Sequence, residues 1–571
     1  MKRLRLILVL VLLAVLAGAA WVWYATPVPV DLANYAPANA LVYMEFDNLA
    51  DVARTIQHTD IWKAAAPITG NNGGNDNRLF VTAARAGIGP IESVLLARTQ
   101  VALVVVGLNT SEEGDTLKVR PELAVIAETH TSRWRTVPVM VEAVKRLANL
   151  TFGATVCSGP QYDGDRFECH IPGTDRTVIG SISGTTIILA NGDDALGTVL
   201  DARGGRRPSI GTDPEFLRSR SSVATQQSLG FGYISSANSG KLFSWTAVQM
   251  GFVPADPQLQ QLLVMGATSI LRTIAWTALP ADGGIEDRFF FSLDPDVVAR
   301  LQPAFETSRR DENIWKLVPD NFKSLTIYRS REPAAAWKSL DTTVSFKLDV
   351  LPAVFFGSLL SSSLLGYGIE NPKATLPALS PPLLTMKTAA GAEGSILIAR
   401  VSDEALLRKA LQQQSDEGPK PQLLDGLQSD PDPAREFAAV FADGYVLLGR
   451  TENVVPCLVE LRKRQAAAVA ANKRNVQDSA RENTAAIVTY ANDEARLTSF
   501  ISTLLLLQGR SLSSEELGKL QSTFGDSSFA ETETRLSAAG IERKTRSAFG
   551  QFSTLIALLK PNPPNSVARQ Q

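Results

Sequence analysis

The chain repeats itself at a long spacing. Six pairs of segments match in the same order along the sequence, and the offset between partners only shrinks, from 284 residues at Leu41/Leu325 to 256 residues at Gly284/Gly540. The pairs are Pro37–Met44 with Pro319–Tyr328, Gly87–Val94 with Gly368–Leu376, Leu123–Glu128 with Ser395–Arg400, Thr186–Ala190 with Tyr445–Gly449, Phe231–Ile234 with Ile487–Tyr490, and Gly284–Glu286 with Gly540–Glu542. Chance similarity would scatter the offsets. The order therefore predicts two homologous halves, at residues 36–310 and 319–560, because repeats of this length indicate duplicated domains.

Within each half, short strand-like runs are separated by turn residues, and helical patterns intervene. Arg176–Ile182 and Thr186–Ala190 flank Ser183-Gly184, and the same pattern recurs around Asp443-Gly444. Both are typical of β-hairpins. Hairpins imply largely antiparallel sheets with helices packed on them. We therefore expect an α+β fold in which each half has a largely antiparallel sheet with packed helices, and a disordered tail at residues 561–571.

The N-terminus predicts a membrane segment. Three basic residues lie within the first five positions, and Leu6–Ala25 then runs 20 residues without a charge, long enough to cross a bilayer as a helix. The basic flank keeps that end cytoplasmic and places the body outside. Small residues at Ala17–Ala20 would suit signal-peptide cleavage, whereas Trp21, Trp23 and Tyr24 favour a retained interfacial anchor. Residues 1–25 are thus a signal anchor or a signal peptide.

The cysteines agree with an extracytoplasmic body. Cys157 and Cys169 flank a turn centred on Asp163, so a hairpin there would place them directly opposite each other. A cross-strand disulfide is then geometrically allowed and would persist outside the cytoplasm. The alternative is a pair of reduced thiols on neighbouring strands. Cys457 lies in an apolar helical stretch, and we expect it to be a small buried residue.

Composition argues against several chemistries. The net charge is −2, which does not favour nucleic-acid binding, because such binding needs an excess of basic charge. Three Cys and three His leave little material for a metal centre. The nucleotide-binding, zinc-protease and serine-hydrolase motifs are missing from the sequence. We therefore expect no cofactor, no metal site and no catalytic residues.

Two sets of polar residues are of types that occur in catalytic sites. His130 follows a strand-like run that ends at Glu128, but no nucleophile can be assigned to this pair. Glu45 and Asp47 close the first strand of the first half, yet the aligned positions in the second half are Arg329 and Arg331. We therefore expect these two carboxylates to be the exposed end of a strand.

One stretch is conspicuously apolar for a soluble chain. It runs from Leu351 to Tyr367 and is interrupted by Pro352, Gly357 and several serines. A buried or amphipathic helix explains it most simply. A membrane-facing or lipid-binding surface is the alternative, and a protein interface is a third. The residues that would form such an apolar surface are Leu351, Val354, Phe355, Phe356, Leu359 and Leu360.

Two segments carry a resemblance to a known family. Tyr35–Leu49 begins with Tyr-Ala-Pro-Ala-Asn-Ala-Leu-Val-Tyr-Met-Glu, and Gly368–Leu379 reads Gly-Ile-Glu-Asn-Pro-Lys-Ala-Thr-Leu-Pro-Ala-Leu. Both resemble elements of a bacterial family of uncharacterised, membrane-anchored extracytoplasmic proteins with a duplicated domain of unknown function. The resemblance implies a single-pass protein of the bacterial inner membrane with its body in the periplasm. It implies no activity and no site residues.

These observations favour a non-enzymatic protein of the cell envelope. It would be held in the membrane by its N-terminal helix and would bind or scaffold another envelope component, a protein or a lipid, through its body. The alternative is a carrier of a lipid or another hydrophobic ligand. A second alternative is a hydrolase whose site is assembled from scattered residues that sequence patterns do not reveal.

Overall fold

The computed structural model describes most of the body of the protein. The described residues are 29–69, 99–113, 116–130, 156–158, 166–170, 177–236, 238, 240, 242, 264–266, 268, 270–308, 311–320, 322–344, 357, 360–388, 395–414, 418–467, 483–507, 510–525 and 528–557. The predicted membrane segment, Leu6–Ala25, lies outside these residues. Within the described part of the chain, no helix is long and apolar enough to span a membrane.

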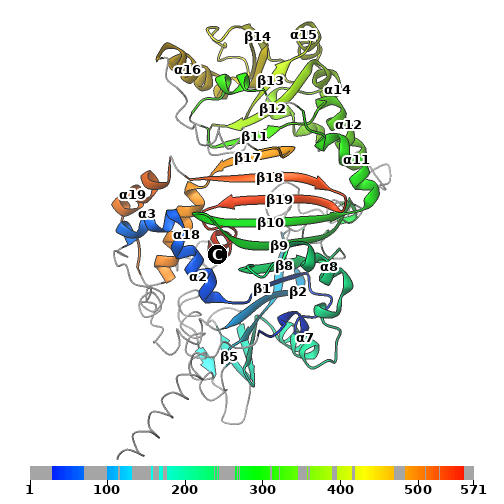
Figure 1. The fold of residues 1–571 in the computed structure, drawn as a ribbon, viewed down its shortest axis with the longest axis vertical. Coiled ribbons are helices and arrows are strands. Elements are labelled where there is room, and N and C mark those ends of the chain that lie inside the picture. The colour runs from blue at the N-terminus through cyan, green and yellow to red at the C-terminus, as the bar shows by residue number, and fades with distance from the viewer. Residues whose placement is uncertain are drawn as a thin grey trace, which may run out of the picture.

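The described strands form one large, twisted sheet with helices on both faces (Figure 1). Its strands are β1 Val42–Phe46, β2 Gln100–Glu113, β3 Thr116–Glu128, β4 Val156–Ser158, β5 Arg166–His170, β6 Thr177–Ser183, β7 Thr186–Ala190, β8 Gly230–Ile234, β9 Leu271–Ala281, β10 Gly284–Leu293, β11 Ser324–Tyr328, β12 Leu379–Lys387, β13 Ser395–Val401, β14 Gln422–Asp425, β15 Phe437–Ala442, β16 Tyr445–Arg450, β17 Ile487–Asn492, β18 Phe529–Ser537 and β19 Gly540–Ser547. All neighbours among these strands pair antiparallel except β14 and β15. The predicted α+β fold with a mostly antiparallel sheet is confirmed.

The strand order repeats. From the outside inward, the first half runs β6-β7-β3-β2-β1-β8-β9-β10. The second half runs β15-β16-β13-β12-β11-β17-β18-β19 in the same connectivity. β4 and β5 extend the first half beyond β6, and β14 extends the second beyond β15. Each strand segment that matched in the sequence and lies in the described residues thus takes the same place in its half.

The two halves join through β10 and β19, which pair over eight residues. Arg288 lies opposite Lys544, and these two positions are themselves counterparts at the 256-residue offset. Ile285 faces Ser547, and their counterparts Ile541 and Phe291 face each other in turn. The register is therefore symmetric about the Arg288/Lys544 pair. Two strands that occupy equivalent places in their halves show this symmetry when a local two-fold axis passes between them.

Local sequence explains the predicted hairpins. Gly184 and Gly444 adopt positive φ angles of 65° and 79°, and Asp443 also has a positive φ of 50°. Left-handed backbone is what tight hairpin turns need, and Gly and Asp tolerate it best. β6/β7 and β15/β16 accordingly form around Ser183-Gly184 and Asp443-Gly444.

The helices begin at side-chain caps where the sequence provides them. Asn48, Asp213, Asp294 and Asp403 each accept a backbone N–H in the first turn of the helix that follows. The helices are α2 Leu49–His58, α3 Asp60–Thr69, α7 Asp193–Arg203, α8 Pro214–Val223, α11 Pro295–Phe305, α12 Pro333–Val344, α14 Pro372–Thr375, α15 Glu404–Gln412, α16 Thr451–Ala467, α18 Glu494–Leu507, α19 Ser514–Gly525 and α20 Phe552–Ala557, with short 3-10 turns η1 Leu32–Asn34, η2 Ile210–Thr212, η3 Asn313–Leu317, η4 Leu365–Tyr367 and η5 Leu376–Ala378.

Strand alternation separates two packing layers. Tyr43 and Ala275 pack in a core with α7, α8 and η1, whereas the adjacent Met44 and Trp276 point to the opposite face and pack with α2 and α20. In the second half, α16 and η3 cover strands β11, β13 and β17 in the same way. The chain already contributes buried side chains at Leu32, before the boundary expected at residue 36.

The helices of the two halves interlock on one face of the central strands. Trp62 and Ala65 of α3 are buried against Leu497, Phe500 and Ile501 of α18. From the other side, Phe552 of α20 packs with Val52 of α2 and Trp276 of β9. α2, α3, α18 and α19 gather at one end of β18, β19 and β10 (Figure 1). The halves therefore share a core instead of standing as separate domains.

This shared core predicts cooperative unfolding. Trp62→Ala removes a buried indole from between the halves and should lower the free energy of unfolding by about 3–5 kcal/mol. Urea denaturation followed by circular dichroism should show one transition, shifted as a whole. The control is Trp337→Ala, because Trp337 lies in α12 and packs only partly buried within the second half. Two transitions, with one unaffected by Trp62→Ala, would contradict a shared core.

Candidate functional site

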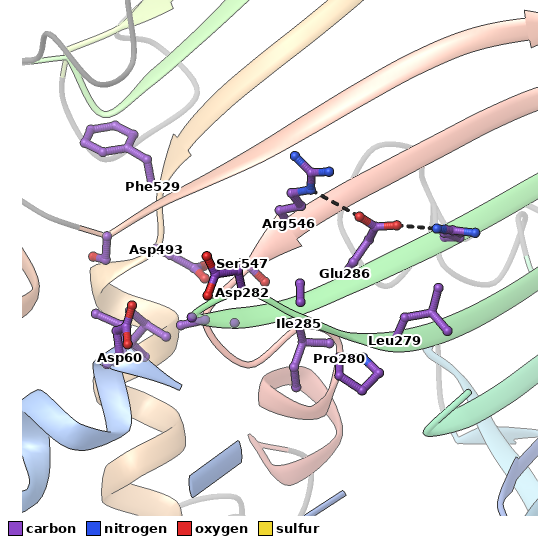
Figure 2. A pocket seen from close by; sticks show the side chains of 18 of the residues that line it. Asp60, Leu279, Pro280, Asp282, Ile285, Glu286, Asp493, Phe529, Arg546 and Ser547 are labelled. Atoms are coloured by element: carbon purple, nitrogen blue, oxygen red, sulfur yellow. Dashed lines mark hydrogen bonds and ion pairs between the residues drawn. The ribbon is translucent and has the colours of Figure 1, made fainter. Parts of the chain in front are cut away.

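A large pocket opens where the two halves meet. It has a volume of about 1160 Å³ and lies beside the turn between β9 and β10, next to α3 and the start of α18 (Figure 2). The first half lines it with Asp60, Ile61, Ala64, Thr225, Gln226, Gln227, Leu279, Pro280, Ala281, Asp282, Gly283, Gly284, Ile285, Glu286 and Arg288, and the second half with Asp493, Leu497, Ser528, Phe529, Arg546, Ser547 and Ala548. We call this the seam pocket.

A buried carboxylate organises the cationic side of the seam pocket. Glu286 Oε1 accepts from Arg288 Nε at 2.8 Å, and Oε2 accepts from Arg546 Nε at 3.1 Å. Lys544 Nζ lies 2.9 Å from Oε2. Hydrogen bonds from these three cations lower the pKa of Glu286, against the effect of its burial. One ionised carboxylate therefore contacts three cations, and its contact with Arg546 is visible in Figure 2. Glu531 and Glu533 of β18 lie opposite Arg546 and Lys544 on the same face.

Carboxylates gather on the other side. Asp282 and Gly283 form the β9–β10 turn, where Gly283 has a φ of 68° and its carbonyl accepts from Asp60 N at 3.0 Å. Asp493 precedes α18 and pairs with Arg496 at 2.8 Å. Burial raises the pKa of Asp493, and Arg496 opposes the shift. In Figure 2, Asp60, Asp282 and Asp493 stand apart from the Glu286–Arg546 contact.

A second buried acid lies next to Glu286 but on the helix-covered face of β10. Asp287 is fully buried, and its Oδ1 accepts from Trp276 Nε1 at 2.9 Å. Its Oδ2 has no hydrogen-bond partner among the described residues. Gly550, with a φ of 53°, brings the second half over it, and a Cβ there would lie 2.8 Å from Oδ2. Burial raises the pKa of Asp287 to about 6, although the Trp276 hydrogen bond favours the ionised form.

The expectation for Glu45 was wrong. Glu45 is only 3% exposed, and its Oε1 pairs with Arg220 Nη2 at 2.7 Å while Oε2 accepts from Tyr43 Oη at 2.6 Å. Burial raises the pKa of Glu45 to about 7, and Arg220 opposes the shift. The strand pattern could not show this, because Arg220 comes from α8, far along the chain. The aligned Arg329 is buried too, donating to the Asn483 carbonyl at 2.6 Å, while Asp47 is exposed as expected.

His130 belongs to a network that fixes the chain entering the body. Gln100 Oε1 accepts from Val30 N at 2.7 Å and lies 3.0 Å from His130 Nε2. Gln100 Nε2 donates to the Val30 carbonyl at 3.1 Å and to Asp47 Oδ1 at 3.0 Å. The His130 backbone N–H in turn donates to Glu128 Oε1. Gln100 therefore positions the His130 ring in this network. Among the described residues, no cysteine, serine or threonine side chain hydrogen-bonds to that ring.

The predicted apolar surface falls mostly outside the described residues. Leu351, Val354, Phe355, Phe356 and Leu359 lie there, and only Leu360 is described, as a half-buried residue. The end of the same stretch is better defined. Leu364 and Tyr367 pack against the core that contains Ile369 and Leu407. For that part of the stretch, packing against the second half is the observed arrangement.

The cysteines lie in the predicted register. Cys157 of β4 is directly opposite Cys169 of β5, and Cys169 is buried and disulfide-bonded. Cys457 is free and buried, as expected, and burial raises the pKa of its thiol to about 12. The side chain of Cys157 lies outside the described residues, so its bond to Cys169 stays a prediction.

The seam pocket has a mixed, largely polar lining. Its described side chains include carboxylates, guanidinium groups, amides and hydroxyls but no histidine, cysteine or lysine. Across the described residues, no three metal-ligating side chains come together. One indirect sign of this site was present in the sequence, because Gly284–Glu286 and Gly540–Glu542 were one of the six matched pairs.

Comparison of the chain with known protein families, with curated proteins and with solved structures finds no match.

Asp287 predicts a pH dependence of stability. The folded pKa of about 6 lies above the ordinary value of 3.8, so the folded state holds the proton more tightly than the unfolded chain. Stability from this group is present at low pH and is lost as pH rises from about 4 to about 6, by about 3 kcal/mol. Asp287→Asn should remove that loss, as measured by denaturation at several pH values. The control is Asp282→Asn, because Asp282 is exposed in the adjacent turn. Equal pH profiles for wild type and Asp287→Asn would contradict this assignment.

The cysteine register predicts a simple alkylation pattern. Denatured but unreduced protein should take up one iodoacetamide, at Cys457, and reduced protein should take up three, as read by intact mass. Cys457→Ala should take up none before reduction. Labelling of three thiols without reduction would show that Cys157 and Cys169 are not bonded.

Proposed function

We propose that this protein is a non-enzymatic component of the bacterial cell envelope. In this proposal an N-terminal helix anchors it in the inner membrane, and its duplicated α+β body, in the periplasm, binds another envelope component. The anchor and the compartment rest on the charge pattern of residues 1–25 and on the paired cysteines. The duplication is supported by the repeated strand order and by the symmetric register of β10 and β19.

The seam pocket is the observation that carries the binding function. Both halves contribute to it, and Glu286 holds two arginines of its lining, Arg288 and Arg546, in place. Because these charged side chains are already held in place, they lose little conformational entropy when a ligand binds, and this favours recognition. The lining combines carboxylates, guanidinium groups and amides, which does not favour a lipid tail. Binding of a polar component is therefore the function that the geometry supports best.

Native mass spectrometry of the full-length protein, extracted gently from its own membranes, tests the proposal. Wild type should retain a bound molecule or polypeptide, and the double variant Arg288→Gln/Arg546→Gln should lose it. Arg535→Gln is the control, because Arg535 lies on the same face of the neighbouring strand β18 with a similarly exposed side chain, 48% against 55% for Arg546. A component retained equally by all three proteins would place binding elsewhere, and a reproducible catalytic turnover abolished by one polar substitution would overturn the non-enzymatic assignment.

A further inference from the structure

The two arginines of the seam pocket are held in place by Glu286, but part of their hydrogen-bonding capacity is unused. Each gives its Nε to a different oxygen of Glu286, so the two guanidinium groups flank one carboxylate. Their terminal nitrogens make no hydrogen bond or ion pair to any described residue, and the side chains are 45% and 55% exposed. Guanidinium groups bind carboxylates through paired N–H donors. This end of the pocket is built for a carboxylate or a similar anion.

The acidic end is suited to a cation. Asp282, in the turn, has no hydrogen bond or ion pair to any described residue. Among the described residues, Asp60 pairs only with Lys63, at 3.2 Å, and both side chains are largely exposed. This contact therefore contributes little and is readily exchanged. An ammonium group placed between Asp60 and Asp282 would gain two carboxylate partners. Asp493 adds a third, more buried carboxylate behind them.

The lining of the seam pocket also offers amide chemistry. Gln226 and Gln227 are exposed in the turn before β8, and their side-chain amides have no partner among the described residues. An amide side chain can pair with both the N–H and the C=O of a peptide unit. This protein already contains that contact, since Gln100 holds both backbone groups of Val30. Leu279, Pro280 and Phe529 add apolar surface to the lining.

From this arrangement we propose that the ligand of the seam pocket is a short zwitterionic peptide. Its ammonium end lies at Asp60 and Asp282, its peptide units lie along Gln226 and Gln227, and its carboxylate end lies at Arg288 and Arg546. The pocket volume, about 1160 Å³, lies just above the usual range for small-ligand sites and accommodates a few residues. This assignment rests on the proposed binding function and specifies its ligand class.

Four forms of one probe test the charge requirement. Tetra-alanine with free termini, its N-acetylated form, its C-amidated form and the doubly blocked form are titrated into full-length protein in detergent by isothermal calorimetry. The free peptide should bind, and blocking either terminus should weaken binding at least about tenfold, because a charge-assisted contact is lost. Failure of the free peptide to bind at millimolar concentration, or equal binding of all four forms, would overturn the peptide assignment.

Two variants test which terminus of the peptide lies at which end of the seam pocket. Asp282→Asn should weaken binding of the free peptide about tenfold and leave binding of the N-acetylated form unchanged. Arg546→Gln should also weaken binding of the free peptide about tenfold, but it should leave binding of the C-amidated form unchanged. Arg535→Gln should change none of these affinities, and thermal denaturation verifies that each variant is folded. Equal loss by a variant for both singly blocked peptides would overturn the proposed orientation.

The result separates this inference from the proposed function. If native mass spectrometry finds a component that depends on Arg288 and Arg546 while tetra-alanine fails to bind, the pocket binds a ligand of another class and only the peptide assignment falls. If neither a retained component nor the peptide depends on these arginines, both fall.

Discussion

The antiparallel pairing of β10 with β19 is the contact on which the rest of the body depends. It is a backbone ladder, so it joins the two halves without requiring particular side chains on either strand. Because antiparallel pairing of equivalent strands is symmetric about its centre, counterpart residues from the two halves end up on the same face. On one face of this pair of strands the side chains include Glu286, Arg288, Lys544 and Arg546.

The helix-covered face shows how far the two halves have become dependent on each other. Trp62 from the first half fills a core built mainly by α18 and α19, and Phe552 from the second half fills one built by α2, β9 and β10. Each half would expose a large apolar surface if it folded without the other. A buried acid, Asp287, lies in the middle of this shared layer, under a loop of the second half that passes close only because residue 550 is glycine.

Sequence alone predicted the fold class and much of the strand layout, because hairpin turns and alternating strands are local signals. Ser183-Gly184 and Asp443-Gly444 marked hairpins that the structure contains. The Cys157/Cys169 register followed from the same logic. The seam pocket was not predictable in this way, since Glu286 and Arg546 come from opposite halves and meet only through the β10–β19 ladder. The prediction that Glu45 is exposed was wrong for the same reason. Its partner Arg220 lies on helix α8, and no strand pattern specifies where that helix packs.

The grip of Gln100 on Val30 has a mechanical consequence. Only four residues separate Val30 from the end of the predicted membrane span at Ala25, and a fully extended chain from Ala25 to Val30 reaches about 18 Å at most. With the anchor retained, the body would have almost no slack and could not swing on a long tether. The seam pocket would then lie at a nearly fixed height above the membrane. A force applied to a peptide bound in the seam pocket would be transmitted through the sheet to η1 and Val30, and from there to the anchor in the bilayer.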